Sequence, residues 1–289
     1  MFRSASALIA IVLAATTAVV QAQDKPTFSV TNLPDKWEKG QTGTNSCAKY
    51  KPSSQTSPCQ NVFINSVQDF CLWGPPGGHD SIGDDEALVV SYCTKSGYGT
   101  RLIPDGSLKG AHFIKTNDFV QVTGYGDFTS IHIKKKDEGG ELDPHGADGR
   151  GNPHGGLVFS RNVKGQEGQW TQLKEWSNFM SATEFSIRAC YGANATNYCP
   201  HTLDEMGSQF NHPGSYAKGS FDNCDANSGH FPAVFKGSTF HQGDKKTPAG
   251  HKPGASSNCQ AVKTVKNGPA SQTPYRRSEP IRADFEDAE

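Results

Sequence analysis

The densest concentration of potential ligand groups in the chain lies between residues 141 and 154. Six side chains there carry oxygen or nitrogen donors: Glu141, Asp143, His145, Asp148, Asn152 and His154. Carboxylate and amide oxygens are ligands for Ca²⁺, and imidazole nitrogens are ligands for transition metals. Asp, Asn, Gly and Pro are also the residues that tight turns require. A structural turn is the favoured interpretation, with a Ca²⁺ or transition-metal site and direct ligand contact as alternatives; no other cofactor is expected.

Two carboxylates in this loop, Glu141 and Asp143, are the best candidates for an acid and a base in glycoside cleavage. Such mechanisms need carboxyl groups about 5–9.5 Å apart, and proximity in the sequence does not set that separation. Nucleophilic catalysis has less support because the chain contains no Gly-x-Ser-x-Gly motif. We therefore expect no catalytic residue, and a carbohydrate-active enzyme that uses this pair is the alternative.

Aromatic residues beside glycine and proline offer a second kind of site. Trp73, Tyr98 and Tyr125 lie next to such residues, in turns where exposed rings can stack on sugar faces. We name these three as candidates for glycan stacking, although core packing is the usual fate of aromatic rings. Asn194, followed by Ala195 and Thr196, forms an N-glycosylation acceptor and is expected at the surface.

The chain contains eight cysteines: Cys47, Cys59, Cys71, Cys93, Cys190, Cys199, Cys224 and Cys259. An even number in an exported protein predicts four disulfides. Zinc binding is less favoured because no Cys-x-x-Cys spacing occurs. Eight cysteines allow 105 sets of pairings. The bridges Cys47–Cys59 and Cys71–Cys93 are favoured because each closes a short loop.

Composition and termini predict the compartment. Residues 1–22 have the pattern of a secretory leader, with Arg3, an apolar stretch and a small-residue cleavage site. A disulfide-bonded β domain is expected over residues 23–242, followed by a largely disordered tail over residues 243–289, which is rich in Lys, Pro, Gly and Ser. A formal net charge of -1 makes nucleic acid an unlikely partner. We expect a secreted, extracellular protein with no membrane anchor.

Short strands separated by turns dominate the rest of the chain. Residues 87–93 and 119–123 are rich in β-branched residues, and residues 130–133, 156–159 and 185–190 alternate apolar and polar positions. Only residues 200–206, with a proline early and a glycine after them, resemble a helix. The sequence predicts a mainly β fold: a single disulfide-bonded β-sandwich or barrel-like domain with long loops and one short helix.

Long stretches of the chain resemble a known family. The resemblance covers roughly residues 44–259, and its motifs lie at residues 67–73, 93–106, 110–116, 118–124, 140–149 and 155–160. The chain is similar there to the secreted basidiomycete proteins called "macrofage activating glycoprotein". This resemblance implies an extracellular, often glycosylated protein of unestablished activity, and it supplies no catalytic residues. It also implies that Ser186 and Ser208 replace two bridged cysteines, with Cα atoms within about 7 Å.

These features together favour a secreted protein that works by binding a glycan or a cell-surface protein at a fungal cell wall or host surface. A carbohydrate-active enzyme and a host-directed effector are the alternatives. The sequence does not set the oligomeric state.

Overall fold

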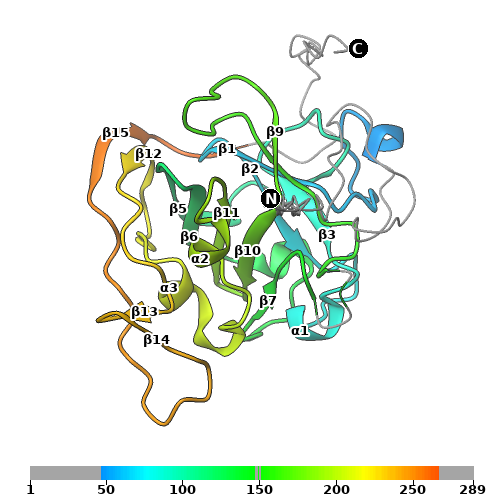
Figure 1. The fold of residues 1–289 in the computed structure, drawn as a ribbon. Helices are drawn as coiled ribbons and strands as arrows, with labels where there is room; N and C mark the ends of the chain where they lie inside the picture. The colour runs from blue at the N-terminus through cyan, green and yellow to red at the C-terminus, as the bar shows by residue number, and fades with distance from the viewer. Residues whose placement is uncertain (1–46, 147–148, 150, 267–289) are drawn as a thin grey trace, which may run out of the picture.

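The computed structural model describes residues 47–146, 149 and 151–266. The expected leader, the candidate Asp148 and the end of the tail lie outside the described residues. Two open β-sheets form the body of the molecule (Figure 1). The mainly β prediction is confirmed, and because the sheets do not close on themselves, the architecture is a sandwich rather than a barrel.

The smaller sheet has six strands in the order β4 (Arg101–Leu102), β3 (Val90–Cys93), β2 (Asp69–Gly74), β1 (Val62–Ser66), β8 (Val158–Ser160) and β9 (Thr171–Leu173). The larger sheet has seven, in the order β15 (Ser256–Val262), β12 (Phe221–Ala226), β5 (Leu108–Lys115), β6 (Phe119–Gly126), β11 (Glu184–Cys190), β10 (Glu175–Met180) and β7 (Gly140–Leu142). A separate hairpin pairs β13 (Val234–Phe235) with β14 (Ser238–Thr239).

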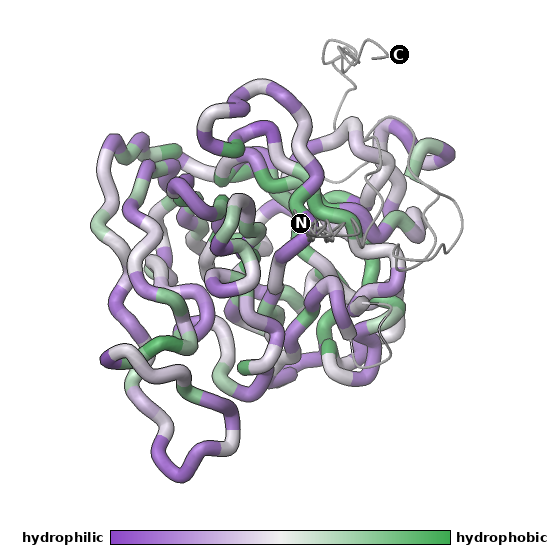
Figure 2. The backbone as a smooth tube through the Cα atoms, in the orientation of Figure 1, coloured by the Kyte–Doolittle hydropathy of each residue, from purple (hydrophilic) through white to green (hydrophobic). Residues whose placement is uncertain are grey.

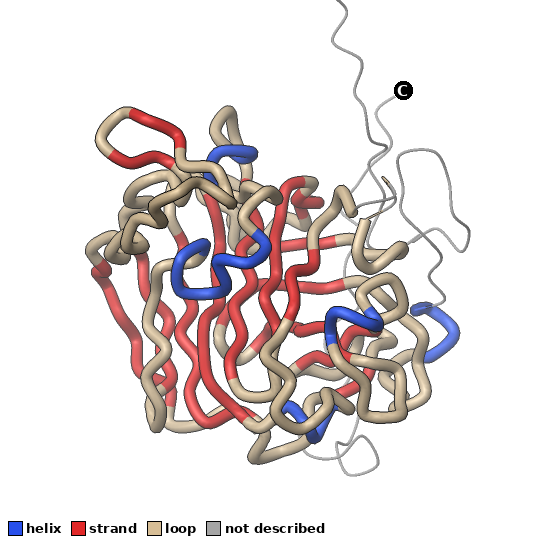
Figure 3. The backbone as a smooth tube through the Cα atoms, turned by 90° about the horizontal axis from the view of Figure 1, so that it is seen from below, coloured by secondary structure: helices blue, strands red, loops and turns tan. Residues whose placement is uncertain are grey.

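Helices are short and lie between the strands. They are η1 (Cys47–Tyr50), α1 (Ile82–Asp85), η2 (Phe128–Ile131), α2 (Ala195–Tyr198), η3 (Asp204–Met206) and α3 (Gly207–Asn211). Figure 3 shows such helices lying over the strands of the sandwich.

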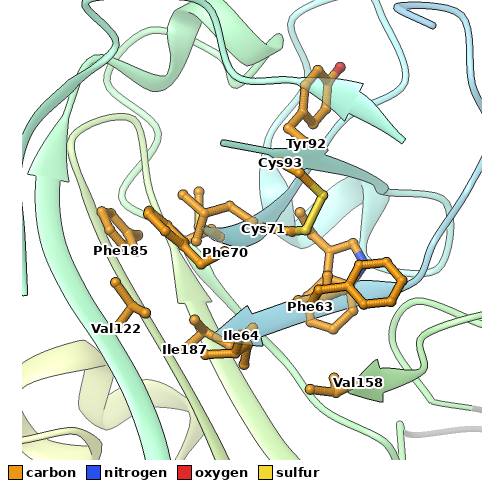
Figure 4. Close-up of a cluster of buried hydrophobic side chains, with 14 of the residues drawn as sticks. Phe63, Ile64, Phe70, Cys71, Tyr92, Cys93, Val122, Val158, Phe185 and Ile187 are labelled. Carbon is orange, nitrogen blue, oxygen red and sulfur yellow. A yellow bond between two sulfur atoms is a disulfide. The ribbon is translucent and has the colours of Figure 1, made fainter. Parts of the chain in front are cut away.

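The main hydrophobic core fills the space between the two sheets. Ile64 and Phe70 from the smaller sheet face Val122, Phe185 and Ile187 from the larger one (Figure 4), and all five are fully buried. The rings of Phe70 and Phe185 stack with centroids 5.6 Å apart. Hydrophobic segments follow these inner strands, whereas hydrophilic segments follow the outer loops (Figure 2). Burial of these side chains is the main force that holds the two sheets together.

The other face of the larger sheet is largely polar, with the Phe119 and Phe179 rings among its polar residues, and it is also buried. Six polar side chains point away from the core because strand residues alternate between the two faces, yet each is at most 4% exposed: His112, Gln121, Thr123, Ser177, Ser186 and Arg188. Residues 199–220, which we call the cover segment, lie over this face, and α3 contacts β10 and β11. The cover is therefore part of the folded domain.

Hydrogen bonds join the cover to this face. His212 lies between two serines, with Nε2 at 2.8 Å from Ser177 Oγ and Nδ1 at 2.8 Å from Ser186 Oγ. Burial lowers the pKa of His212 well below its usual value. The His212 amide donates to the Ser208 carbonyl, so Ser186 contacts the imidazole and Ser208 contacts the backbone of the same residue. That they replace a disulfide stays a prediction.

Arg188 occupies the middle of the same face. Its Nε donates to Gln121 Oε1 at 2.7 Å, its Nη1 donates to the Tyr198 carbonyl at 2.9 Å, and its guanidinium lies over the Phe119 ring. Burial lowers the pKa of Arg188 to about 9. Polar satisfaction, rather than apolar burial alone, organises this side of the sheet.

All eight cysteines are bridged, as predicted. The expected pairs Cys47–Cys59 and Cys71–Cys93 form, and the other two bridges join Cys190 to Cys199 and Cys224 to Cys259. Cys71–Cys93 links β2 to β3 inside the core, as Figure 4 shows. Cys190–Cys199 links the end of β11 to the start of the cover segment.

Two local predictions are wrong. Residues 130–133 do not form a strand, because Asp127 caps a 3-10 turn over Phe128–Ile131 by accepting from the Thr129 amide. The helix expected over residues 200–206 begins only at Asp204, as η3, and Gly207 does not end it but starts α3.

The expected disorder of the tail from residue 243 is also wrong for Ser256–Val262. These residues form β15, which pairs with β12, and Cys259 is bridged to Cys224. Most β15 side chains are exposed, so backbone pairing and a covalent link hold a segment whose composition offers little to bury.

Candidate functional site

Ionisable side chains gather at the β7 edge of the larger sheet. The helices α1 and η3 both contact β7, and Figure 1 shows α1 beside this edge. Glu141 comes from β7 itself, Glu86 directly follows α1, and Asp204 begins η3. Segments far apart in the sequence therefore bring carboxyl groups to one place.

Glu141 is the most buried of these carboxyl groups. Strand alternation turns Leu142 into the core and Glu141 to the opposite face, where it pairs in register with Phe179. Glu141 is 6% exposed, and both carboxyl oxygens are shielded from solvent with the Asp204 carboxyl beside them. Burial, followed by the neighbouring carboxyl groups of Asp204, Asp143 and Glu86, raises the pKa of Glu141 to about 10. This group is therefore protonated at neutral pH.

Glu86 is the second perturbed acid. Its Oε2 accepts a hydrogen bond of 2.8 Å from Asn152 Nδ2. Burial raises the pKa of Glu86 to about 7, with smaller contributions from Asp143 and Asp204. Neighbouring carboxyl groups with different pKa values can donate and accept protons at the same pH.

Asp143 and Asn152 close the loop that follows β7. Their backbones exchange two hydrogen bonds, of 3.0 Å and 2.9 Å. Asp143 Oδ1 also accepts from the amides of His145 at 2.7 Å and Gly146 at 3.0 Å. Asp143 thus has the role that a turn residue requires, which supports the turn interpretation at this position and fixes the backbone of His145.

A second cluster lies next to the first and contains two residues that the sequence analysis did not name. His145 Nε2 lies 3.1 Å from Glu175 Oε2, and the rings of His145 and His201 stack with centroids 3.8 Å apart. The donor atoms of His145, Glu175 and His201 all lie within 4.8 Å of one another. Two imidazoles and one carboxylate at these distances have the composition of a transition-metal site.

Tertiary structure, not local sequence, assembles this cluster. Glu175 is the first residue of β10 and pairs in register with Cys190 of β11. The bridge from Cys190 to Cys199 then brings His201, two residues further on, back to the same place. The Cys190–Cys199 pairing was the missing signal, and the sequence left it open.

Comparison with known proteins shows the family of the chain. The chain is 57% identical over 243 residues to the appressorium protein ROW2 of Mycosarcoma maydis, and the match covers 83% of each chain. This chain belongs to the ROW2 family. It is also 44% identical over 263 residues to the appressorium protein ROW1 of the same fungus, covering 86% of this chain and 62% of ROW1, so it spans about three-fifths of that relative. No family model matches the chain, and no solved structure matches it.

The aromatic candidates in this ROW2-family chain need correction. Trp73 and Tyr98 are not exposed for stacking on sugars, because they are 0% and 8% exposed and belong to the core. Trp73 donates from Nε1 to the Gln60 carbonyl and packs on Trp176, and Tyr98 stacks on Phe63. Burial of a large aromatic ring stabilises the fold strongly, so these rings are buried even though the glycine and proline residues beside them predicted exposed turns.

The remaining candidates differ in their surroundings. Tyr125 is half-buried with the Lys218 ammonium 3.7 Å from its ring centroid. His154 is half-buried, and its amide donates to the Ala87 carbonyl. Asn194 is exposed at the start of α2, which suits a glycosylation acceptor. Within the described ranges, no helix is long and apolar enough to span a bilayer.

Proposed function

We propose that this chain is a secreted protein that acts at the fungal surface during host contact and binds a glycan without cleaving it. The ROW2 and ROW1 relatives are named as appressorium proteins. The leader expected over residues 1–22 and the four disulfides suit an oxidising, extracellular compartment. A glycan on Asn194 and the resemblance to the "macrofage activating glycoprotein" group belong to the same proposal.

The chemistry of the surface carries the choice of ligand. Among the described residues, Leu88 is the exposed large hydrophobic side chain, at 61% exposure. Protein partners are commonly met by contiguous apolar patches, whereas here the carboxyl groups around β7 are the main gathering of functional groups. The carboxyl oxygens of the half-buried Glu86 and the exposed Asp204 can accept hydrogen bonds from sugar hydroxyls, so a hydroxyl-rich glycan fits this surface better than an apolar protein face.

Burial of Glu141 argues for binding without turnover. A general acid must come within about 2.6–3.2 Å of the oxygen that it protonates. Both carboxyl oxygens of Glu141 are shielded from solvent, so a glycosidic oxygen does not reach them in this conformation. The Glu141 and Asp143 pair therefore lacks access to a substrate bond.

Cleavage of a glycan is the second candidate, and Glu86 is the observation that favours it. Its pKa of about 7 and its half-buried position beside Asp143 suit a proton donor next to a carboxylate. A host-directed effector that binds a protein is the third possibility and predicts no polysaccharide binding.

Sedimentation of the purified chain with insoluble chitin, chitosan, β-1,3-glucan and cellulose tests the proposal. We expect saturable binding to at least one polymer, weakened about tenfold in the double variant Glu86→Gln/Asp204→Asn, since two acceptors are lost at about 0.5–1.5 kcal/mol each. The matched control is Glu138→Gln, an exposed carboxylate outside the cluster, which should bind as the wild type does.

Release of soluble sugar from the same polymers separates the candidates. Turnover that disappears in Glu86→Gln supports the enzyme and overturns the binding proposal. Absence of binding to every polymer, or equal binding by all variants, also contradicts it.

A further inference from the structure

Three side chains from three separate segments converge beside the carboxyl cluster. His145 lies in the loop after β7, Glu175 begins β10, and His201 lies in the cover segment. All three are partly exposed, with His145 and Glu175 side chains at 34% and 20% exposure. A metal ion from solvent can therefore reach them without unfolding the domain.

Independent constraints hold each backbone. The Asp143 carboxylate accepts from the His145 amide at 2.7 Å, and Gly151 donates to the His145 carbonyl at 3.0 Å. The β10–β11 pairing fixes Glu175 opposite Cys190, and the disulfide from Cys190 to Cys199 limits the reach of His201. Ligands on constrained backbones lose less entropy when they bind an ion than ligands on free loops do.

The donor set selects for particular metals. Imidazole nitrogen suits zinc, copper, nickel and iron, whereas Ca²⁺ and Mg²⁺ prefer sites made of oxygen. Bonds of about 2.0–2.1 Å in a tetrahedral zinc site place ligand atoms about 3.3 Å apart. The present atoms lie within 4.8 Å of one another. Side-chain rotations that move each donor atom by about 1 Å bring all three to bonding distance from one metal ion. Partly exposed side chains have that freedom.

We propose that His145, Glu175 and His201 bind one divalent transition-metal ion, with Zn²⁺ as the representative ligand. The ion would connect the β7 loop, the start of β10 and the cover segment. Three protein ligands leave a fourth position for water or for an oxygen of an external ligand. This inference does not depend on glycan binding, because its ligand is the metal alone.

Other histidine pairs in the described part of the chain lack this composition. His230 and His251 stack with centroids 4.8 Å apart, and His79 and His132 meet edge to face at 5.3 Å. Neither pair belongs to a group of three metal-ligating residues. The exposed His230 is therefore a matched control for an imidazole that stacks on another without a third ligand.

Isothermal titration of the full chain with ZnCl₂, after EDTA treatment and dialysis, tests the proposal. We expect about one ion per chain, with affinity reduced at least ~10-fold in His145→Ala, His201→Ala and Glu175→Gln. His230→Ala should bind as the wild type does. Zinc should also raise the unfolding temperature of the wild type and of His230→Ala, because a ligand that binds only the folded state stabilises it.

Unfolding temperatures in EDTA show whether each variant is folded, and Glu175→Gln keeps the shape of the side chain if an alanine variant is not. The proposal is overturned if the wild type shows no saturable zinc binding below ~100 μM. It is equally overturned if the folded site variants bind as tightly as the wild type or if His230→Ala loses as much affinity as they do.

Discussion

The two faces of the seven-stranded sheet are both buried, but different interactions hold them. The inner face presents Val122, Phe185 and Ile187 to the smaller sheet across a hydrophobic core. The outer face presents polar groups such as Thr123 and Ser186 to the cover segment, residues 199–220. Non-directional burial joins the two sheets, whereas directional hydrogen bonds join the sheet to its cover.

This difference explains where the site forms. An apolar interface tolerates few ionisable groups because burying an unpaired charge is costly. The polar face continues to the β7 edge, where Glu141 and Glu175 meet His201 and Asp204 from the cover segment. Substitutions on the two faces should therefore change the free energy of unfolding by different amounts and with different pH dependence.

Removal of a core ring should have the largest effect. Phe185→Ala deletes a fully buried side chain that stacks on Phe70, and such truncations cost about 3–5 kcal/mol. Urea unfolding followed by circular dichroism measures the change. A loss below about 1 kcal/mol would mean that the inner face does not depend on apolar packing.

Loss of the buried imidazole should rank second. His212→Ala leaves the Ser177 and Ser186 hydroxyls without their partner, at about 1–3 kcal/mol for each group. We expect a total of about 2–4 kcal/mol by urea unfolding. A neutral result would indicate that water replaces the imidazole and that the cover is not held there.

The pH dependence of the same variant sharpens this prediction. Because the folded-state pKa of His212 lies below its unfolded value of about 6.5, the unfolded chain binds a proton first. This contribution to stability is complete above pH 6.5 and is lost as pH falls below it. The stability difference between wild type and His212→Ala should therefore shrink from pH 7 to pH 5.

Glu141→Gln should have a smaller effect of opposite sign. The pKa of Glu141 is raised to about 10, so its contribution is complete below pH 4.5 and is lost as pH rises towards 10. A neutral amide removes the cost of protonation and should stabilise the protein by roughly 1–3 kcal/mol at pH 7. Equal stability of the two proteins at pH 7 and pH 9 would show that Glu141 is ionised in the fold.

The smallest effect is expected at a single contact between sheet and cover. Thr123→Val keeps the shape of the side chain and removes the hydrogen bond of 2.6 Å from Oγ1 to the Ser215 carbonyl. One such bond contributes about 0.5–1.5 kcal/mol. Urea unfolding measures it, and a loss comparable with that of Phe185→Ala would remove the distinction between the two faces.

Sequence patterns predicted where the strands lie, but they did not predict which segments cover the faces of the strands. β-Branched content identified β6 and alternation identified β11 near their observed bounds, Phe119–Gly126 and Glu184–Cys190. The same alternation cannot show whether polar positions such as Gln121 and Arg188 face water or a covering segment. Exposure of the second face depends on where residues 199–220 return, which is a tertiary property.

The candidate site was predictable only where it is local. Residues 141–154 identified Glu141, Asp143 and His145 as neighbours in the sequence. Glu175 and His201 join them through strand register and the Cys190–Cys199 bridge, and Glu86 joins through α1. A search for clusters along the chain cannot find contacts that a disulfide and a sheet edge create.

Native-state hydrogen exchange, followed by mass spectrometry, tests the difference between the faces most directly. Amides in the cover segment, including those of α3, should exchange through local opening at a lower free energy than amides of β6 and β11, since cooperative units held by fewer apolar contacts open first. Equal protection of the cover and the central strands, up to global unfolding, would contradict the conclusion that directional hydrogen bonds, rather than a hydrophobic core, join the cover to the sheet.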